Sequence, residues 1–282
     1  MILMPQYPPP ATAPVEMTVS SAGATVALVS LSVVGVIGLV WAVADAVRRR
    51  SPMFLAVFLG GVATSMLEPF ADLLGFVWFP LNQVQAFTML GIPIPLFVVI
   101  GYSNLFGLLP WIFLRALEAS PDRRRFWQVS VAMMLAACVF EWLLLRTGAY
   151  TYYGNQPLVV WGYPMIWMTI NTGACVLAAA VIHRLPTLFR GAGAWAAVAV
   201  VPCADGAVML GTGWPAFAAI HSELGKPVVH LLGLLTIGLG LALFAVIGEL
   251  CCTDGRLRTA SPGSPGDVPA PRPSHAVEEA RA

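Results

Sequence analysis

Long apolar runs separated by short polar segments dominate this chain. Most runs are close to the roughly 20 residues that a helix needs to cross about 30 Å of hydrocarbon. The ten-residue alternation of a membrane β-barrel is absent, and helices satisfy their own backbone polar groups in lipid. The pattern therefore predicts an all-α integral membrane protein, a bundle of about seven transmembrane helices near residues 22–43, 53–66, 93–112, 127–145, 165–182, 194–210 and 228–250.

Composition agrees with lipid as the solvent of this chain. Of its 282 residues, 58% are hydrophobic and only 10% are charged, whereas a soluble domain has about 25% charged residues. Basic residues gather beside the apolar runs and form no stripe, which excludes nucleic acid as a partner. We therefore expect a multi-pass protein whose partners are the lipid bilayer of the cell membrane and a lipophilic small molecule.

The arginines predict the orientation. Basic residues gather in cytoplasmic loops of membrane proteins, and here they follow the first, third, fifth and seventh runs, at 48–50, 115 with 123–125, 184 with 190, and 256 with 258. The N-terminus is thus expected outside and the C-terminus in the cytoplasm. We divide the chain into a disordered arm (1–21), a transmembrane domain (22–252) and a disordered cytoplasmic tail (253–282), which is rich in Pro, Ser and Gly.

Three acids lie inside a predicted span or directly at its end: Glu141 and Asp205 inside, and Glu68 just after the short second run. Each costs at least about 2.5 kcal/mol on insertion scales, so each suggests a function. Counted from the arginine-marked ends at about 1.5 Å per residue, all three lie roughly 20–24 Å into the bundle, and Asn171 reaches about the same level. This common depth predicts one cavity in the outer half of the bundle.

Buried carboxyl groups suit proton transfer. Desolvation disfavours a charged carboxylate, so we expect at least one of these acids to hold its proton beside an ionised neighbour. Asp72 follows Glu68 by four residues and shares its face if the helix continues through Pro69. The candidate catalytic residues are therefore Glu68, Glu141, Asp205 and Asp72. The candidate substrate-binding residues are Trp78, Tyr102, Tyr150, Tyr152, Trp167 and Asn171.

Structural roles are the alternative for the same residues. Glu68 would then cap a helix end, Asp205 would hydrogen-bond Asn171 between helices, and Tyr150 and Tyr152 would anchor an aromatic belt at the interface.

No metal or cofactor is expected. His221 and Glu223 are too few for a metal site. The chain contains no His-Glu-x-x-His, nucleophile-elbow, Walker or dinucleotide motif. It also contains no aspartate-rich box to hold magnesium on a diphosphate, which argues against ionisation-type prenyl chemistry.

Short motifs in residues 66–164 resemble a known family. The stretches are Phe140-Glu141-Trp142, Gly148-Ala149-Tyr150-Thr151-Tyr152 and Tyr163-Pro164, preceded by Glu68-Pro69 with Asp72. They are similar to the AveC-like spirocyclase family of actinobacterial membrane proteins, and more weakly to membrane cyclases of carotenoid biosynthesis. The chain has Glu68 where the family pattern has Asp, and Met165-Ile166 where a further acid would follow the proline.

The resemblance implies spiroketal formation or dehydration on a polyketide, and it nominates Glu68, Asp72, Glu141, Tyr150 and Tyr152 as site residues. Our leading hypothesis is a membrane-embedded acid–base cyclase for a lipophilic polyketide or isoprenoid. A proton-coupled transporter or export accessory is the alternative, because buried carboxylates also serve transport. A structural partner subunit is the third possibility.

Overall fold

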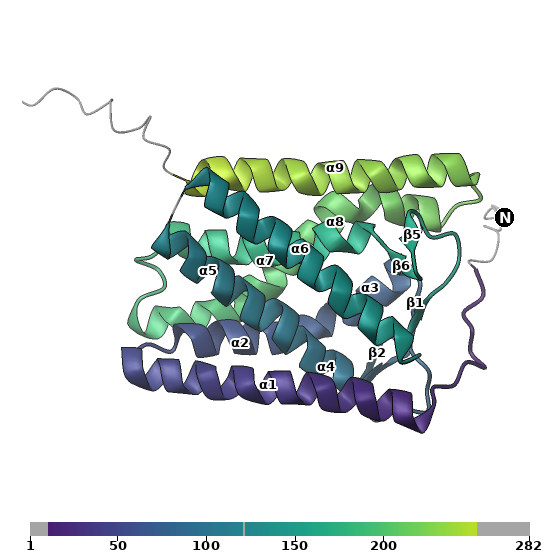
Figure 1. The fold of residues 1–282 in the computed structure, drawn as a ribbon, viewed down its shortest axis with the longest axis horizontal. Helices are drawn as coiled ribbons and strands as arrows, with labels where there is room; N and C mark the ends of the chain where they lie inside the picture. Colours follow the sequence, from purple (N-terminus) through teal and green to yellow (C-terminus); the bar gives the residue numbers. More distant parts are fainter. Residues whose placement is uncertain (1–10, 121, 253–282) are drawn as a thin grey trace, which may run out of the picture.

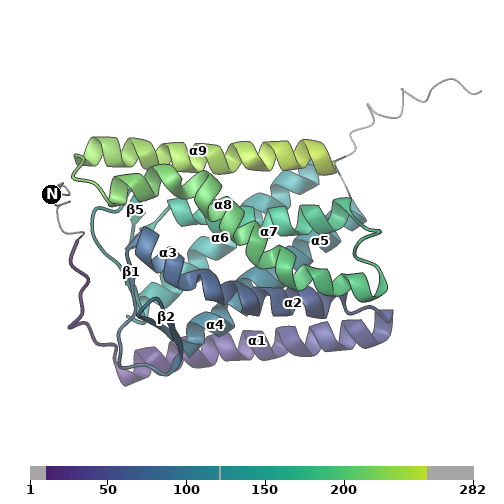
Figure 2. The same cartoon turned by 180° about the vertical axis from the view of Figure 1, so that it is seen from behind.

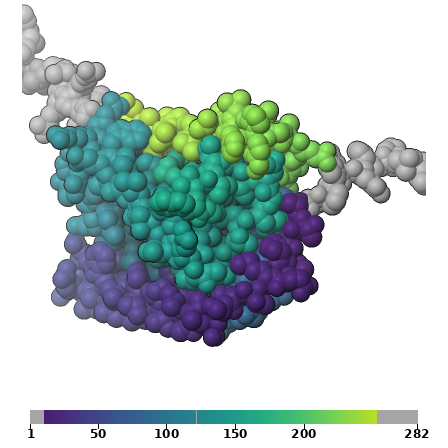
Figure 3. Space-filling model, turned by 45° about the vertical axis from the view of Figure 1, so that its right-hand side comes forward, coloured from purple at the N-terminus to yellow at the C-terminus, as the bar shows by residue number. Residues whose placement is uncertain are grey.

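The computed structural model describes residues 11–120 and 122–252. The predicted tail at 253–282 and the first ten residues of the predicted arm lie outside the described residues. Within the described part, seven helical spans are long and apolar enough to cross a membrane: Ser21–Arg49, Met53–Gly75, Leu96–Ala119, Arg123–Arg146, Ile166–Arg184, Gly191–Ile220 and Lys226–Cys251. The spans lie side by side in one bundle (Figure 1 and Figure 3). The prediction of an all-α multi-pass membrane protein is confirmed.

Four spans are single helices and three are composite. The single helices are α1 (Ser21–Arg49), α6 (Arg123–Arg146), α7 (Ile166–Arg184) and α9 (Lys226–Cys251). The second span joins α2 (Met53–Thr64), a 3-10 turn η1 (Ser65–Leu67) and α3 (Glu68–Gly75). The third joins α4 (Leu96–Tyr102), a π-helical segment η2 (Ser103–Leu108) and α5 (Leu109–Ala119). The sixth joins a 3-10 segment η3 (Gly191–Ala196) to α8 (Ala197–Ile220).

Two spans continue past a proline and end well beyond the predicted residues. The second continues through Pro69 to Gly75. Proline stands there near the start of α3, where it needs no backbone N–H partner. The sixth continues past Pro215 to Ile220, and the backbone N–H of Ala216 finds the hydroxyl of Thr236 on α9 at 3.1 Å. The second span therefore continues because its proline stands at a helix start. The sixth continues because a hydroxyl group from α9 accepts a hydrogen bond from its backbone.

Close approach of the second and third spans depends on glycine. A Cβ added to Gly61 on α2 would lie 2.5 Å from the backbone nitrogen of Gly107 in η2. Small residues permit such backbone contacts between membrane helices. The π segment leaves backbone carbonyls without their usual helical partners, and the Cys175 thiol lies 3.4 Å from one of them, the carbonyl oxygen of Leu105.

Three short antiparallel ribbons cover one end of the bundle, the end where α1 begins (Figure 1). Their strands are β1 (Val77–Trp78) with β4 (Thr151–Tyr152), β2 (Gln85–Met89) with β3 (Ile92–Pro95), and β5 (Val159–Val160) with β6 (Tyr163–Pro164). The sequence analysis did not predict them, and it assigned residues 93–95 to a helix. Positive φ angles at Leu90 and Gly91 form the tight turn between β2 and β3.

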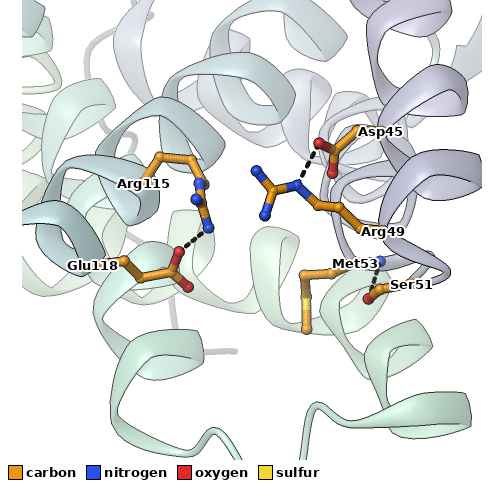
Figure 4. A network of polar contacts seen from close by, with 6 residues as sticks. All are labelled: Asp45, Arg49, Ser51, Met53, Arg115 and Glu118. Atoms are coloured by element: carbon orange, nitrogen blue, oxygen red, sulfur yellow. Dashed lines mark hydrogen bonds and ion pairs between the residues drawn. The ribbon is translucent and has the colours of Figure 1, made fainter.

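The arginine-rich loops lie at the opposite end. There the Arg49 side chain bonds the buried Asp45 at 2.7 Å on α1, and Arg115 pairs with Glu118 on α5 (Figure 4). Arg123 at the start of α6 pairs with Glu249 near the end of α9. The positive-inside rule places this end in the cytoplasm. We therefore call the ribbon-covered end the outer end.

Candidate functional site

A cavity of about 90 Å³ lies in the outer part of the bundle. Side chains from α1, α3, α4, α6 and α7 line it, together with β1 and β4. Most of this wall is aromatic or aliphatic, including Phe79, Phe97, Phe140 and Leu31. Within the described residues, α6 packs along α5, α7 and α9 but makes no extended contact with α1 or α4. The cavity thus occupies the space that these helices leave between them.

Glu68 and Tyr102 form the first polar pair in the cavity. Glu68 begins α3, directly after the 3-10 turn of the second span, and its side chain is buried. Tyr102 is the last residue of α4 before the π segment. The phenol of Tyr102 donates a hydrogen bond to Oε2 of Glu68. The pair therefore joins the second span to the third.

Glu141 and Tyr150 form the second pair. Glu141 lies on α6 about one and a half turns before the helix ends at Arg146, and the chain reverses through Gly148, whose φ is +74°. This turn returns Tyr150 toward α6, where its phenol donates a hydrogen bond to Oε2 of Glu141. Glu141 is also close enough to Glu68 for the two charges to repel each other. The two carboxyl–phenol pairs therefore share one cavity.

Tyr152 packs beside the second pair. Its ring contacts Tyr150 and Tyr163 edge to face, with ring centroids 5.9 and 6.1 Å apart, and lies 6.4 Å from the Trp167 ring. Burial, and next the nearby Glu141 charge, raise the pKa values of Tyr150, Tyr152 and Tyr163 well above that of a free tyrosine. All three phenols therefore keep their protons at neutral pH and can act as hydrogen-bond donors.

Asp72 lies one helical turn after Glu68, on the same face, because α3 continues through Pro69. The prediction that depended on this continuation is confirmed. Asp72 is 3% exposed, and neither of its carboxyl oxygens meets a hydrogen-bond donor among residues 11–120 and 122–252. Asp72 does not line the cavity, but the charge of Glu68 acts on its carboxyl group.

Asp205 is buried on α8, which packs beside α2 and α3 (Figure 2). Its charge acts on Glu68 and Tyr102, yet it does not line the cavity. Within the described part of the chain, no hydrogen bond joins Asp205 to Asn171, contrary to the structural alternative considered above. Of the three acids that were predicted to share one cavity, Glu68 and Glu141 line it. Asp205 does not line it.

The predicted substrate-binding residues divide in two. Tyr102, Tyr150, Tyr152, Trp167 and Asn171 all line the cavity. Trp78 does not, and its neighbour Val77 lines the cavity instead. Successive strand residues point to opposite faces, so only one residue of β1 can face inward.

The sequence analysis missed the aromatic wall of Phe79, Phe97 and Phe140. Apolar residues are the rule throughout the spans, so nothing marked these three as facing inward. It also left Tyr163 out of the site, although this residue belongs to one of the quoted motifs. Tyr163 is fully buried and its hydroxyl has no hydrogen-bond partner among the described residues.

Proton transfer is the chemistry that these groups support. In residues 11–120 and 122–252, no group of three or more His, Cys, Asp or Glu residues is arranged to hold a metal ion. Over the same ranges, the ion pairs join only residues near the cytoplasmic end, so none neutralises an acid of the cavity region. His221 lies outside the cavity, and its Nε2 contacts the carbonyl oxygens of Leu73 and Leu74 at the end of α3.

The fold and the site define a multi-pass membrane protein with an internal cavity that bears two carboxyl–phenol pairs. No family model matches the chain, and no curated protein or solved structure matches it either. The functional interpretation therefore depends on the residues of the cavity.

Proposed function

We propose that this chain is a membrane-embedded acid–base cyclase of the cell membrane, acting on a lipophilic polyketide or isoprenoid. The observation that carries the proposal is the presence of two carboxyl–phenol pairs, Glu68–Tyr102 and Glu141–Tyr150, in one largely apolar cavity. An acid and a base on separate spans can serve two different atoms of one bound substrate. The spirocyclase resemblance quoted above is part of the same proposal.

On a dihydroxyketone, the reaction is a spiroketal closure. One carboxyl group protonates the ketone oxygen while the other accepts a proton from the first hydroxyl group as its oxygen attacks the carbonyl carbon. The second carboxyl group, now protonated, gives its proton to the hemiketal hydroxyl group, which leaves as water. The second hydroxyl group of the substrate then attacks the oxocarbenium ion and releases its proton to the first carboxylate. One water leaves for each spiroketal formed, both carboxyl groups return to their starting states, and no oxidant is needed.

On an acyclic polyene, the same groups support an isomerisation. Protonation of one double bond gives a carbocation, a second double bond attacks it to form a carbon–carbon bond, and the base removes a neighbouring proton. Ring faces such as those of Phe140 and Trp167 can stabilise the cation. The apolar wall limits the access of water, which would otherwise trap the cation as an alcohol.

The direct test uses the purified full chain in detergent, with two probes assayed separately. These are a synthetic long-chain dihydroxyketone and an acyclic polyprenyl hydrocarbon, with products resolved by chromatography and mass spectrometry. We expect the wild-type protein to convert one probe into a dehydrated or isomeric product. Loss of a general acid or base costs about 10²–10⁴-fold, so Glu141→Gln should lower the rate by that factor.

Glu118→Gln is the matched control, because Glu118 is an exposed acid near the cytoplasmic end of α5. It should retain the wild-type rate. The proposal is wrong if the wild-type protein converts neither probe, or if Glu141→Gln turns over as fast as Glu118→Gln.

A proton-coupled transporter is the second candidate, and Asp205 favours it. This acid is buried outside the cavity, forms no ion pair with any residue that the structure describes, and its charge acts on Glu68. Chains of buried acids are typical of proton-coupled transport. In proteoliposomes with a pH gradient, a transporter would move the dihydroxyketone unchanged, whereas a cyclase would yield product in detergent without any gradient.

A further inference from the structure

Asp72 is the least satisfied polar side chain near the cavity. This residue is 3% exposed, and both of its carboxyl oxygens lack a hydrogen-bond donor in the part of the chain that the structure describes. A buried acceptor without a partner costs about 1–3 kcal/mol, and more if it is charged. An ionised Asp72 would therefore be costly at this place.

The neighbours of Asp72 offer no positive charge. The groups whose charges act on it or respond to it are Glu68 on the same helix, and the phenols of Tyr102, Tyr152 and Tyr153. No Arg, Lys or His forms an ion pair with it in the described part of the chain. Nothing nearby therefore compensates a negative charge on this carboxyl group.

Glu68 and Asp72 lie one helical turn apart on the same face of α3, and both side chains are buried. Two ionised carboxylates contain only acceptors, so a hydrogen bond between them requires a proton. One proton held between the two groups would give Asp72 its missing partner. Glu68 would still accept the hydrogen bond from Tyr102.

We propose that Glu68 and Asp72 share one proton in the resting protein, so that this pair is the proton donor of the site and Glu141 is the acceptor. Glu141 has no second acid on its own helix with which to share a proton, and the Tyr150 phenol donates a hydrogen bond to it, as Tyr102 does to Glu68. Asp72 acts through Glu68 and is a positioning residue. The assignment of donor and acceptor rests on the proposed cyclase function, whereas the shared proton does not.

Over one reaction cycle, the number of protons that the site gives to the substrate equals the number that it takes back. A proton leaves the Glu68–Asp72 pair for a ketone oxygen or an alkene carbon, and Glu141 takes one from a substrate hydroxyl group or from the carbon next to the cation. Return of one proton from Glu141 to the pair then restores the resting state.

Infrared difference spectroscopy of the full chain in lipid nanodiscs tests the shared proton without any substrate. A protonated carboxyl group has a carbonyl stretching band that shifts in heavy water, and a carboxylate lacks this band. We expect Asp72→Asn and Glu68→Gln each to remove the same single band, because the new amide donates to the remaining carboxylate. The double variant should remove no further band.

Asp45→Asn is the matched control, because Asp45 is equally buried but bonded to Arg49. It should leave the band unchanged. Two separate bands assigned to Glu68 and Asp72 would mean two protons, and no loss in either variant would mean two carboxylates; both outcomes overturn the inference. If one variant fails to fold, the other still reports the same proton.

The two proposals fail separately. A missing band together with turnover of a probe would refute the shared proton alone. The expected band in a protein that converts neither probe would refute the cyclase and leave the shared proton standing.

Discussion

Replacement of Gly61 by alanine should push the second and third spans apart. The new Cβ would lie 2.5 Å from the backbone nitrogen of Gly107 and 2.9 Å from its Cα. These are backbone atoms inside a helical segment, so no side-chain rotation can relieve the contact. The helices must separate by about 1 Å, because ordinary contacts between carbon atoms are about 3.5–4.0 Å.

Overpacking of this kind costs about 1–3 kcal/mol, and a rigid backbone neighbour favours the upper part of that range. Alanine also gains up to about 1 kcal/mol over glycine in a helix interior. Gly238→Ala on α9 isolates that gain, since a Cβ there meets nothing within 4 Å. The difference between the two variants should therefore be about 1–3 kcal/mol, with Gly61→Ala the less stable.

The assay is thermal unfolding in detergent, followed with a thiol-reactive dye that reports the exposure of the buried Cys138 and Cys175. One kcal/mol corresponds to about 2–4 °C in a domain of this size. Gly61→Ala should melt below the wild type, and Gly238→Ala at or above it. Equal melting temperatures for the two variants would refute the close helix contact on which this reasoning depends.

Two further changes test separate parts of the structure. Tyr102→Phe removes the hydrogen bond to Glu68 and should lower turnover of a converted probe about 10–100-fold, as expected for the loss of about 1.5–3 kcal/mol from a hydrogen bond to a charged or shared-proton group. Tyr153→Phe, whose hydroxyl has no such role, should turn over normally, and equal rates would contradict the assignment. Arg49→Ala leaves the buried Asp45 without its partner and should cost about 1–3 kcal/mol in thermal unfolding. Adding Asp45→Asn should restore most of that loss, and failure to do so would show that the ion pair is unimportant.

The spans and their polarity could be predicted because lipid imposes strong rules on sequence. A helix in hydrocarbon must be long and apolar, and arginines mark its cytoplasmic end. Span ends were harder to predict where prolines stand, since Pro69 and Pro215 are compatible with a continuing helix in this structure. The ribbons of the outer end were missed because two-residue strands have no period that a sequence pattern could reveal.

The acids of the site could be nominated because a carboxyl group inside a span is costly and therefore conspicuous. Their phenol partners were only partly predictable. Tyr102 and Tyr150 were singled out, but their pairing with Glu68 and Glu141 depends on the π segment and on the turn at Gly148. The apolar wall could not be predicted, because Phe97 facing inward and a phenylalanine facing lipid look the same in sequence.

The π segment of the third span changes the direction in which side chains point in one half of the span relative to the other half. Its extra residue rotates everything on one side by about 100° relative to an unbroken α-helix. Tyr102 belongs to the outer half, whereas Trp111, which stacks on Phe54 with ring centroids 4.6 Å apart, belongs to the inner half. Gain or loss of one residue at η2 would thus re-aim the phenol while the cytoplasmic packing stayed in register, which gives this architecture a simple way to change its chemistry between relatives.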